Sequence, residues 1–174
     1  MDHFEKQAGV SVEATDQDFD YWLNQSHVGA TLRSELSQAN ILLVPNFLSA
    51  EGKKLVFPEH TESLFQYLKD NASSGANVDI CIEDEDYVER ALHSDLISLA
   101  TFVVTSVLIP VLVNLLSDYI KKVYGRQAEK SDVEVTLIEV KPDGNARKLS
   151  YKGKAADLKK TIDGLRGGTN ASGH

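Results

Sequence analysis

The longest apolar run in the chain covers residues 96–117. Its 22 residues include no charged side chain, and fifteen of them are Leu, Ile, Val, Phe or Ala. A helix of that length extends ~33 Å, about the thickness of the hydrocarbon core of a bilayer. The pattern predicts one long apolar helix over residues 88–124. Its oligomer or membrane face would consist of Phe102, Val103, Val107, Leu108, Val111, Leu112 and Leu115.

Three features of this predicted helix complicate a simple membrane span. Pro110 lies near its middle and Asn114 is costly in lipid. Lys121 and Lys122 follow the run, so the positive-inside rule puts the C-terminus in the cytoplasm and would require the acidic N-terminal part to cross the membrane. Three readings remain open: conditional or permanent association with a membrane, burial in an oligomer, and the core of a soluble monomer.

Shorter patterns before this run predict a small α/β unit over residues 39–86. The apolar run 39–45 and the alternating segment Val78–Ile82 are typical of buried strands, and 54–58 is a shorter extended piece. Between them, Thr61 can cap a helix with Leu64 and Leu68 on its apolar face. Strand, helix and strand in this order favour a βαβ-like unit with a parallel strand pair. Residues 1–38 would form a loose tail to about residue 15 and then two helices.

The C-terminal part predicts a ββα module over residues 131–166. Val133, Val135 and Leu137 alternate with polar residues, a turn at 141–145 follows, and residues 154–165 carry the period of an amphipathic helix. Residues 167–174 would be a flexible tail. The predicted fold class is therefore α+β (mixed): a βαβ-like unit, one long apolar helix and the ββα module.

The charge of the chain is divided unevenly between its two halves. The 174 residues carry a net charge of −8, but residues 1–95 hold 18 acidic and 6 basic residues, whereas residues 96–174 hold 8 and 12. Such a division suggests two surfaces with different partners. Cys81 is the single cysteine and lies in an apparent buried strand, and the N-terminus has no signal peptide. We therefore expect a cytoplasmic protein, either free or at the inner face of or inserted in the cell membrane.

Acidic residues around the strand 78–82 are the one candidate for metal chemistry. Asp79, Glu83, Asp84 and Asp86 could hold a divalent cation and make the chain a soluble metal-dependent enzyme. The simpler interpretation is that Asp84 caps a following helix and its neighbours favour the helix dipole. The histidines lack metal-binding spacing and no glycine-rich phosphate loop follows a strand. We therefore expect no catalytic residues, no metal site and no cofactor.

The C-terminal module is basic, but we do not expect nucleic acid as a partner. Tyr151 is its sole aromatic residue, so it lacks the stacking platform of single-strand binders. The expected partners are the chain itself, as a homo-oligomer, and a membrane.

Residues 100–166 resemble a known family. The apolar segment Ile109–Leu116, its basic exit and the strand–turn–strand–helix ending near Leu165 are similar to the effector-associated constant components of bacterial conflict systems. The resemblance implies a non-enzymatic accessory of a defence effector protein, which would be a further partner. The predicted function is thus a membrane-associated or oligomerising accessory component, with the metal-dependent enzyme as the alternative.

Overall fold

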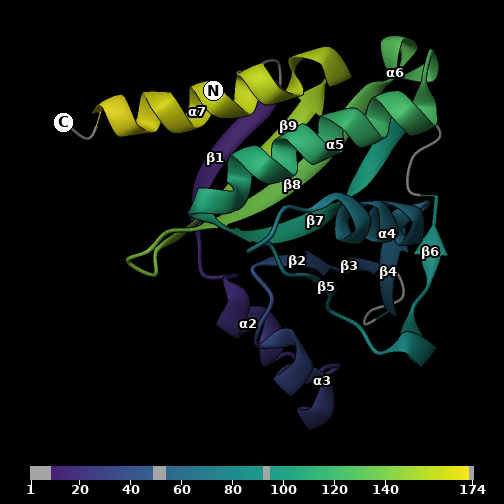
Figure 1. Ribbon diagram of the computed structural model, residues 1–174, viewed down its shortest axis with the longest axis vertical. Helices are drawn as coiled ribbons and strands as arrows, with labels where there is room; N and C mark the ends of the chain where they lie inside the picture. Colours follow the sequence, from purple (N-terminus) through teal and green to yellow (C-terminus); the bar gives the residue numbers. More distant parts are fainter. Residues whose placement is uncertain (1–8, 49–53, 92–94, 173–174) are drawn as a thin grey trace.

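A six-stranded sheet organises the chain (Figure 1). The computed structural model describes residues 9–48, 54–91 and 95–172. The strand order is β1-β9-β8-β7-β2-β5; β7 runs parallel to β8 and β2 parallel to β5, while the other pairs are antiparallel. The strands are β1 (Val10–Thr15), β2 (Ile41–Val44), β5 (Val78–Ile80), β7 (Leu96–Thr105), β8 (Asp132–Val140) and β9 (Ala146–Gly153).

Helices cover both faces of this sheet (Figure 1). On one face, α4 (Thr61–Asn71), α5 (Ile109–Tyr124) and α7 (Leu158–Ser172) enclose the larger apolar core. On the other, α2 (Phe19–Leu23) and α3 (Ala30–Leu36) enclose a smaller core built on β2, β7 and β8. The short α6 (Gln127–Lys130) connects α5 to β8. A second sheet consists of β3 (Asn46–Leu48), β4 (Lys54–Pro58) and β6 (Glu89–Arg90).

The mixed α/β class and several predicted elements are confirmed. The strand–helix–strand unit is present as β2, α4 and β5, and β2 pairs with β5 in parallel. The C-terminal ββα pattern is present as β8, β9 and α7, with Gly144 in the turn at a φ of 93°. These elements belong to one sheet and one main core, because β8 pairs with β7 and Leu158 and Ile162 of α7 lie in the same core as Leu112 of α5.

The long apolar helix is not found, and that prediction is wrong. Residues 96–105 form the strand β7, Ser106–Leu108 form a 3₁₀ turn, and α5 begins at Ile109. Pro110 lies in the first turn of α5, where its missing N–H costs nothing, so it starts the helix. Among the described residues, no helix is long and apolar enough to span a membrane, which contradicts the predicted transmembrane helix.

The apolar run misled the prediction because β7 is buried on both faces. Phe102 and Val104 face the larger core, whereas Val103 faces the smaller one. A strand between two helical layers has no polar face, so it lacks the alternation that identifies a half-exposed strand. The β-branched residues of the run suit a strand.

Both ends of the chain carry more regular structure than expected. Residues 10–15 form β1 instead of a loose tail, and α7 continues to Ser172 through most of the predicted flexible tail. Residues 1–8 and 173–174 lie outside the described residues. The first helix begins later than predicted, because Asp18 accepts from the backbone N–H of Tyr21 and caps α2.

The helix α4 is capped from outside itself. Thr61, the predicted cap, lies in the helix and donates from its hydroxyl to the carbonyl of Pro58 over 2.6 Å. The carboxylate of Glu89 on β6 accepts instead from the backbone N–H groups of His60, at 2.9 Å, and Glu62, at 2.8 Å. Tyr87 donates to the same carboxylate. Glu89 thereby satisfies two N–H groups that no preceding turn can reach.

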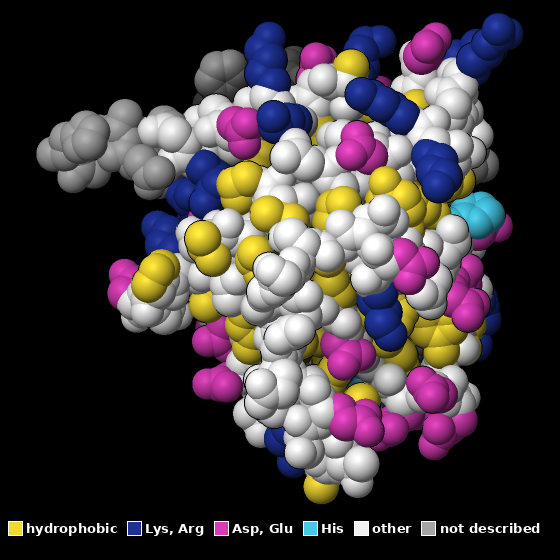
Figure 2. Space-filling view, viewed as in Figure 1, with side chains coloured by type: hydrophobic (Ala, Val, Ile, Leu, Met, Phe, Trp, Pro, Cys, Tyr) yellow, Lys and Arg dark blue, Asp and Glu magenta, His cyan; other side chains and the backbone are white. Residues whose placement is uncertain are grey.

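The uneven charge of the sequence is visible on the surface. In Figure 2, Lys and Arg side chains gather on the upper part of the molecule, over α5, α6 and α7, and Asp and Glu are more frequent below. The two halves of the chain thus present different electrostatic surfaces on this face.

Candidate functional site: a charged cluster at one end of the sheet

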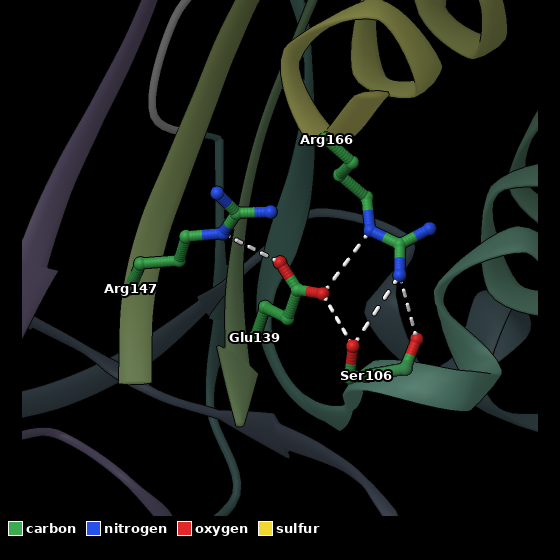
Figure 3. Close-up of polar contacts among 4 residues, drawn as sticks. All are labelled: Ser106, Glu139, Arg147 and Arg166. Carbon is green, nitrogen blue, oxygen red and sulfur yellow. Dashed lines mark hydrogen bonds and ion pairs between the residues drawn. The ribbon is translucent and has the colours of Figure 1, made fainter. Parts of the chain in front are cut away.

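A polar cluster lies where the carboxyl ends of two parallel strands meet. Glu139 lies near the end of β8, and Ser106 directly follows the end of β7. The β7–β8 register places Val104 opposite Glu139, so these chain segments are neighbours. Arg147 lies directly opposite Glu139 on β9, and Arg166 reaches the cluster from α7 (Figure 3).

Glu139 is the centre of the cluster and is almost completely buried, with 1% of its surface exposed. Arg147 Nε donates to Oε1 of Glu139 over 2.7 Å. Arg166 Nε and the hydroxyl of Ser106 both donate to Oε2, over 3.1 and 2.6 Å. Arg166 also donates from Nη2 to the carbonyl oxygen of Ser106 over 3.0 Å, which fixes α7 against the start of α5.

The environment of Glu139 favours its charged form. Burial by itself would raise its pKa, but the hydrogen bonds from Ser106 and Arg147 and the charges of Arg166 and Arg147 outweigh burial and lower the pKa below its ordinary value. Glu139 is therefore ionised at neutral pH. Two guanidinium cations share this one carboxylate, so the three side chains together carry one positive charge in excess.

A pocket of about 370 Å³ opens beside the cluster. Its lining consists of Ser106, Glu139, Lys141, Pro142, Asp143, Arg147 and Arg166. Arg147 is 7% exposed, and its Nη1 is buried without a hydrogen-bond partner. Since a buried N–H group without an acceptor is costly, the cluster beside the pocket carries both an excess positive charge and an unused donor.

The chemistry open to the cluster depends on which of its polar groups already make hydrogen bonds within it. Both oxygens of Glu139 accept strong hydrogen bonds, and Ser106 uses its hydroxyl proton to donate to Glu139. Neither group is placed to act as a general base or an activated nucleophile, because that requires an acceptor free to take a proton. The guanidinium groups and Lys141 supply N–H donors, which suit an anion.

The acidic residues predicted as a possible metal site lie elsewhere. Asp79 is on β5, and Glu83, Asp84 and Asp86 lie in and beside a 3₁₀ turn at 84–86, not at the start of a longer helix. Glu83 lies within 3.4 Å of the backbone N–H of Gly29. Across residues 9–48, 54–91 and 95–172, no three acidic, histidine or cysteine side chains come together as metal ligands.

The residues predicted as an oligomer or membrane face do not form one face. Phe102, Val103 and Leu112 are buried in the core, and Leu108, Val111 and Leu115 are half-buried. Val107 is the exception, with 80% of its surface exposed in the turn between β7 and α5. Because a strand, a turn and a helix carry these residues, Phe102 and Leu112 lie in the larger core and Val103 lies in the smaller one.

Cys81 and His27 lie together without the properties of a catalytic pair. His27 Nε2 is 3.0 Å from the carbonyl oxygen of Cys81 and 3.9 Å from its sulfur. Cys81 is fully buried, as expected of a core residue, and burial together with the nearby Asp79 raises its pKa to about 12. The thiolate that a nucleophilic cysteine needs is therefore disfavoured.

The charged cluster was missed in the sequence, although one signal for it exists. Glu139 continues the apolar alternation of Val133, Val135 and Leu137, so it must share their buried face. Arg147 has the same phase as Leu149 on the returning strand. A carboxylate and a guanidinium on one apolar face, joined by a turn, predict a buried ion pair. The alternation of residues along the strands does not predict that Ser106 and Arg166 join this cluster.

Comparisons with known proteins add no identification. No protein-family model, no curated protein and no solved structure matches the chain. The resemblance of residues 100–166 to effector-associated components therefore stays a prediction.

Proposed function

We propose that this chain is a non-enzymatic accessory component that binds a small anion, a phosphate or carboxylate group, in the pocket beside Glu139. The observation that carries this proposal is the charge balance of the cluster: two arginines share one buried carboxylate. Lys141 and Asp143 also line the pocket and offset each other, so its lining keeps one positive charge in excess, which the bound group would balance.

The groups around the pocket fit such a ligand. Arg166 makes its hydrogen bonds through Nε and Nη2 and contributes to the lining together with Lys141 and Arg147. Guanidinium groups match the planar or tetrahedral oxygen arrangement of carboxylates and phosphates. The volume of about 370 Å³ has room for a phosphate group and a small attached moiety.

Calorimetric titration with inorganic phosphate and with acetate tests the proposal directly. Ionic strength is held constant with chloride so that general screening does not imitate binding. We expect saturable binding of at least one of these anions and thermal stabilisation. Binding to the folded state alone contributes about 2.7 kcal/mol when the anion is at 100 times its Kd.

Two matched variants make the test specific. Arg166→Gln removes one cation from the pocket, whereas Lys160→Gln removes one from an exposed position on the same helix, α7. Arg166→Gln should weaken binding about tenfold or more, a loss of about 1.4 kcal/mol. Lys160→Gln should leave it unchanged. Equal affinity of the two variants, or no saturable binding by the wild type, would contradict the proposal.

A further inference from the structure

The outer edge of β1 is a second candidate binding surface, separate from the anion pocket. β1 is the terminal strand of the six-stranded sheet, so within the described part of the chain one of its two edges has no neighbouring strand. Val12, with 40% of its surface exposed, and the exposed Glu13 and Ala14 lie along it. A strand edge of six residues that has no neighbour in its sheet is a ready template for another strand.

The pairing of β1 with β9 fixes which backbone groups face this open edge. The N–H of Lys152 donates to the carbonyl of Gly9 over 2.7 Å, so these residues form a hydrogen-bonded pair. In an antiparallel ladder, hydrogen-bonded pairs alternate with non-bonded ones. The backbone groups of Ser11, Glu13 and Thr15 therefore also bond to β9. The N–H and C=O groups of Val10, Val12 and Ala14 therefore point outward.

We propose that β1 pairs antiparallel with β1 of a second copy of the chain. The outward-bonding residues are symmetric about Val12, so a two-fold axis there places Val12 opposite Val12 of the second copy and Val10 opposite its Ala14. All three outward-facing residues of each strand then find partners in a single register. The two sheets join into one continuous sheet across an isologous interface.

The charges on β1 fit this register. Glu13, the sole charged residue of the strand, lies opposite Lys148 on its own β9. In the proposed register Glu13 faces the neutral Ser11 of the second copy, so no like charges lie directly opposite. On the other face of the strand, Val12 packs against its own symmetry mate, which removes two exposed valines from water. The exposed Val12 at the two-fold axis and the absence of opposed like charges are the features that favour a second copy as the partner.

Light scattering coupled to size exclusion tests the dimer. The wild-type chain should be dimeric at high micromolar concentration and dissociate on dilution. Val12→Lys puts a charge at the two-fold axis and should give a monomer at every concentration. The matched control is Val107→Lys, the same change at an exposed valine far along the sequence from this edge, and it should stay dimeric.

Amide hydrogen exchange provides a second readout without mutation. The outward N–H groups of Val10, Val12 and Ala14 should become protected as the protein concentration rises, while the N–H of Gly144 in the β8–β9 turn should not change. A wild-type chain that is monomeric at several hundred micromolar would overturn the proposal. A Val12→Lys variant that is as dimeric as the wild type would do the same. The edge does not depend on the anion pocket, so either proposal can fail alone.

Discussion

Glu139 and Arg147 lie directly opposite each other on β8 and β9, and Arg147 Nε donates to Glu139 Oε1 over 2.7 Å. Their side chains are 2% and 8% exposed, so the pair is almost fully removed from water. Buried ion pairs give weak net stabilisation, because desolvation offsets the attraction of the charges. The pair is thus better explained by its effect on geometry than by net stabilisation. It holds the guanidinium group of Arg147 at the pocket, while Arg166 approaches Glu139 from the other side.

Removing the shared carboxylate should destabilise the fold strongly. Glu139→Gln leaves two arginines facing each other without a counter-charge, and breaking a buried pair in this way costs about 3–5 kcal/mol. Urea unfolding followed by circular dichroism would measure the loss. Glu129→Gln, the same change at an exposed position on α6, should alter stability by less than about 0.5 kcal/mol. Equal effects of the two substitutions would show that the cluster is not a coupled unit.

Stability should fall in acid below about pH 4.5. Glu139 and Glu89 both have pKa values lowered in the folded state; for each, burial raises the pKa but hydrogen bonds and nearby cations outweigh it. A depressed folded pKa contributes stability above the unfolded value of 4.5, and that contribution is lost as the pH falls through the folded pKa. The urea midpoint should be level from pH 7 down to about pH 5 and decrease below about pH 4.5. A midpoint that rises in this acid range would contradict the assignment.

The cap on α4 should be measurable by itself. Glu89→Ala removes the acceptor for the N–H groups of His60 and Glu62 and should cost about 1–2 kcal/mol, like the loss of other helix caps. Glu89→Gln keeps an acceptor oxygen and should cost less. Hydrogen exchange should show faster exchange at the first turn of α4 in Glu89→Ala. Unchanged exchange there would mean that the helix start does not depend on Glu89.

Aspartate substitutions distinguish the strand–turn–helix arrangement from one continuous apolar helix. Val107→Asp changes a side chain that is 80% exposed and should be tolerated, whereas Leu112→Asp puts a charge into the main core and should prevent stable folding. A folded-protein yield and a thermal unfolding curve would separate the two. Comparable damage from both substitutions would indicate that Val107 is buried and that the turn is misplaced.

The elements that were predicted correctly are those whose hydrophobic pattern fits only one type of secondary structure. Val133, Val135 and Leu137 alternate with polar residues because one face of β8 is less buried, and this strand was predicted correctly. β7 was mistaken for part of a helix because both of its faces are buried, and a fully apolar run does not distinguish a central strand from a buried helix. Its identity depends on pairing with β2, which precedes it in the sequence, and with β8, which follows it.

The candidate site was harder to predict than the fold. Glu139 and Arg147 lie on the same face of one hairpin, so the local sequence contained enough information to predict their pairing. Ser106 and Arg166 are 60 residues apart and meet only because α7 packs across α5. Likewise, Glu89 caps a helix that begins 28 residues before it, through pairing of β4 with β6. Contacts of this kind are set by tertiary packing.

The most direct test of the anion pocket follows the arginine side chains by nuclear magnetic resonance. The chain has five arginines, and Arg33, whose Nε donates to the carbonyl of Leu23 over 2.9 Å, serves as an internal reference. With inorganic phosphate titrated at constant ionic strength, the Nε–Hε signals of Arg147 and Arg166 should shift together along one saturable curve, while the signal of Arg33 stays in place. If Arg147 and Arg166 do not move, or if all arginines drift linearly with phosphate, the pocket does not bind this anion and the central claim is wrong.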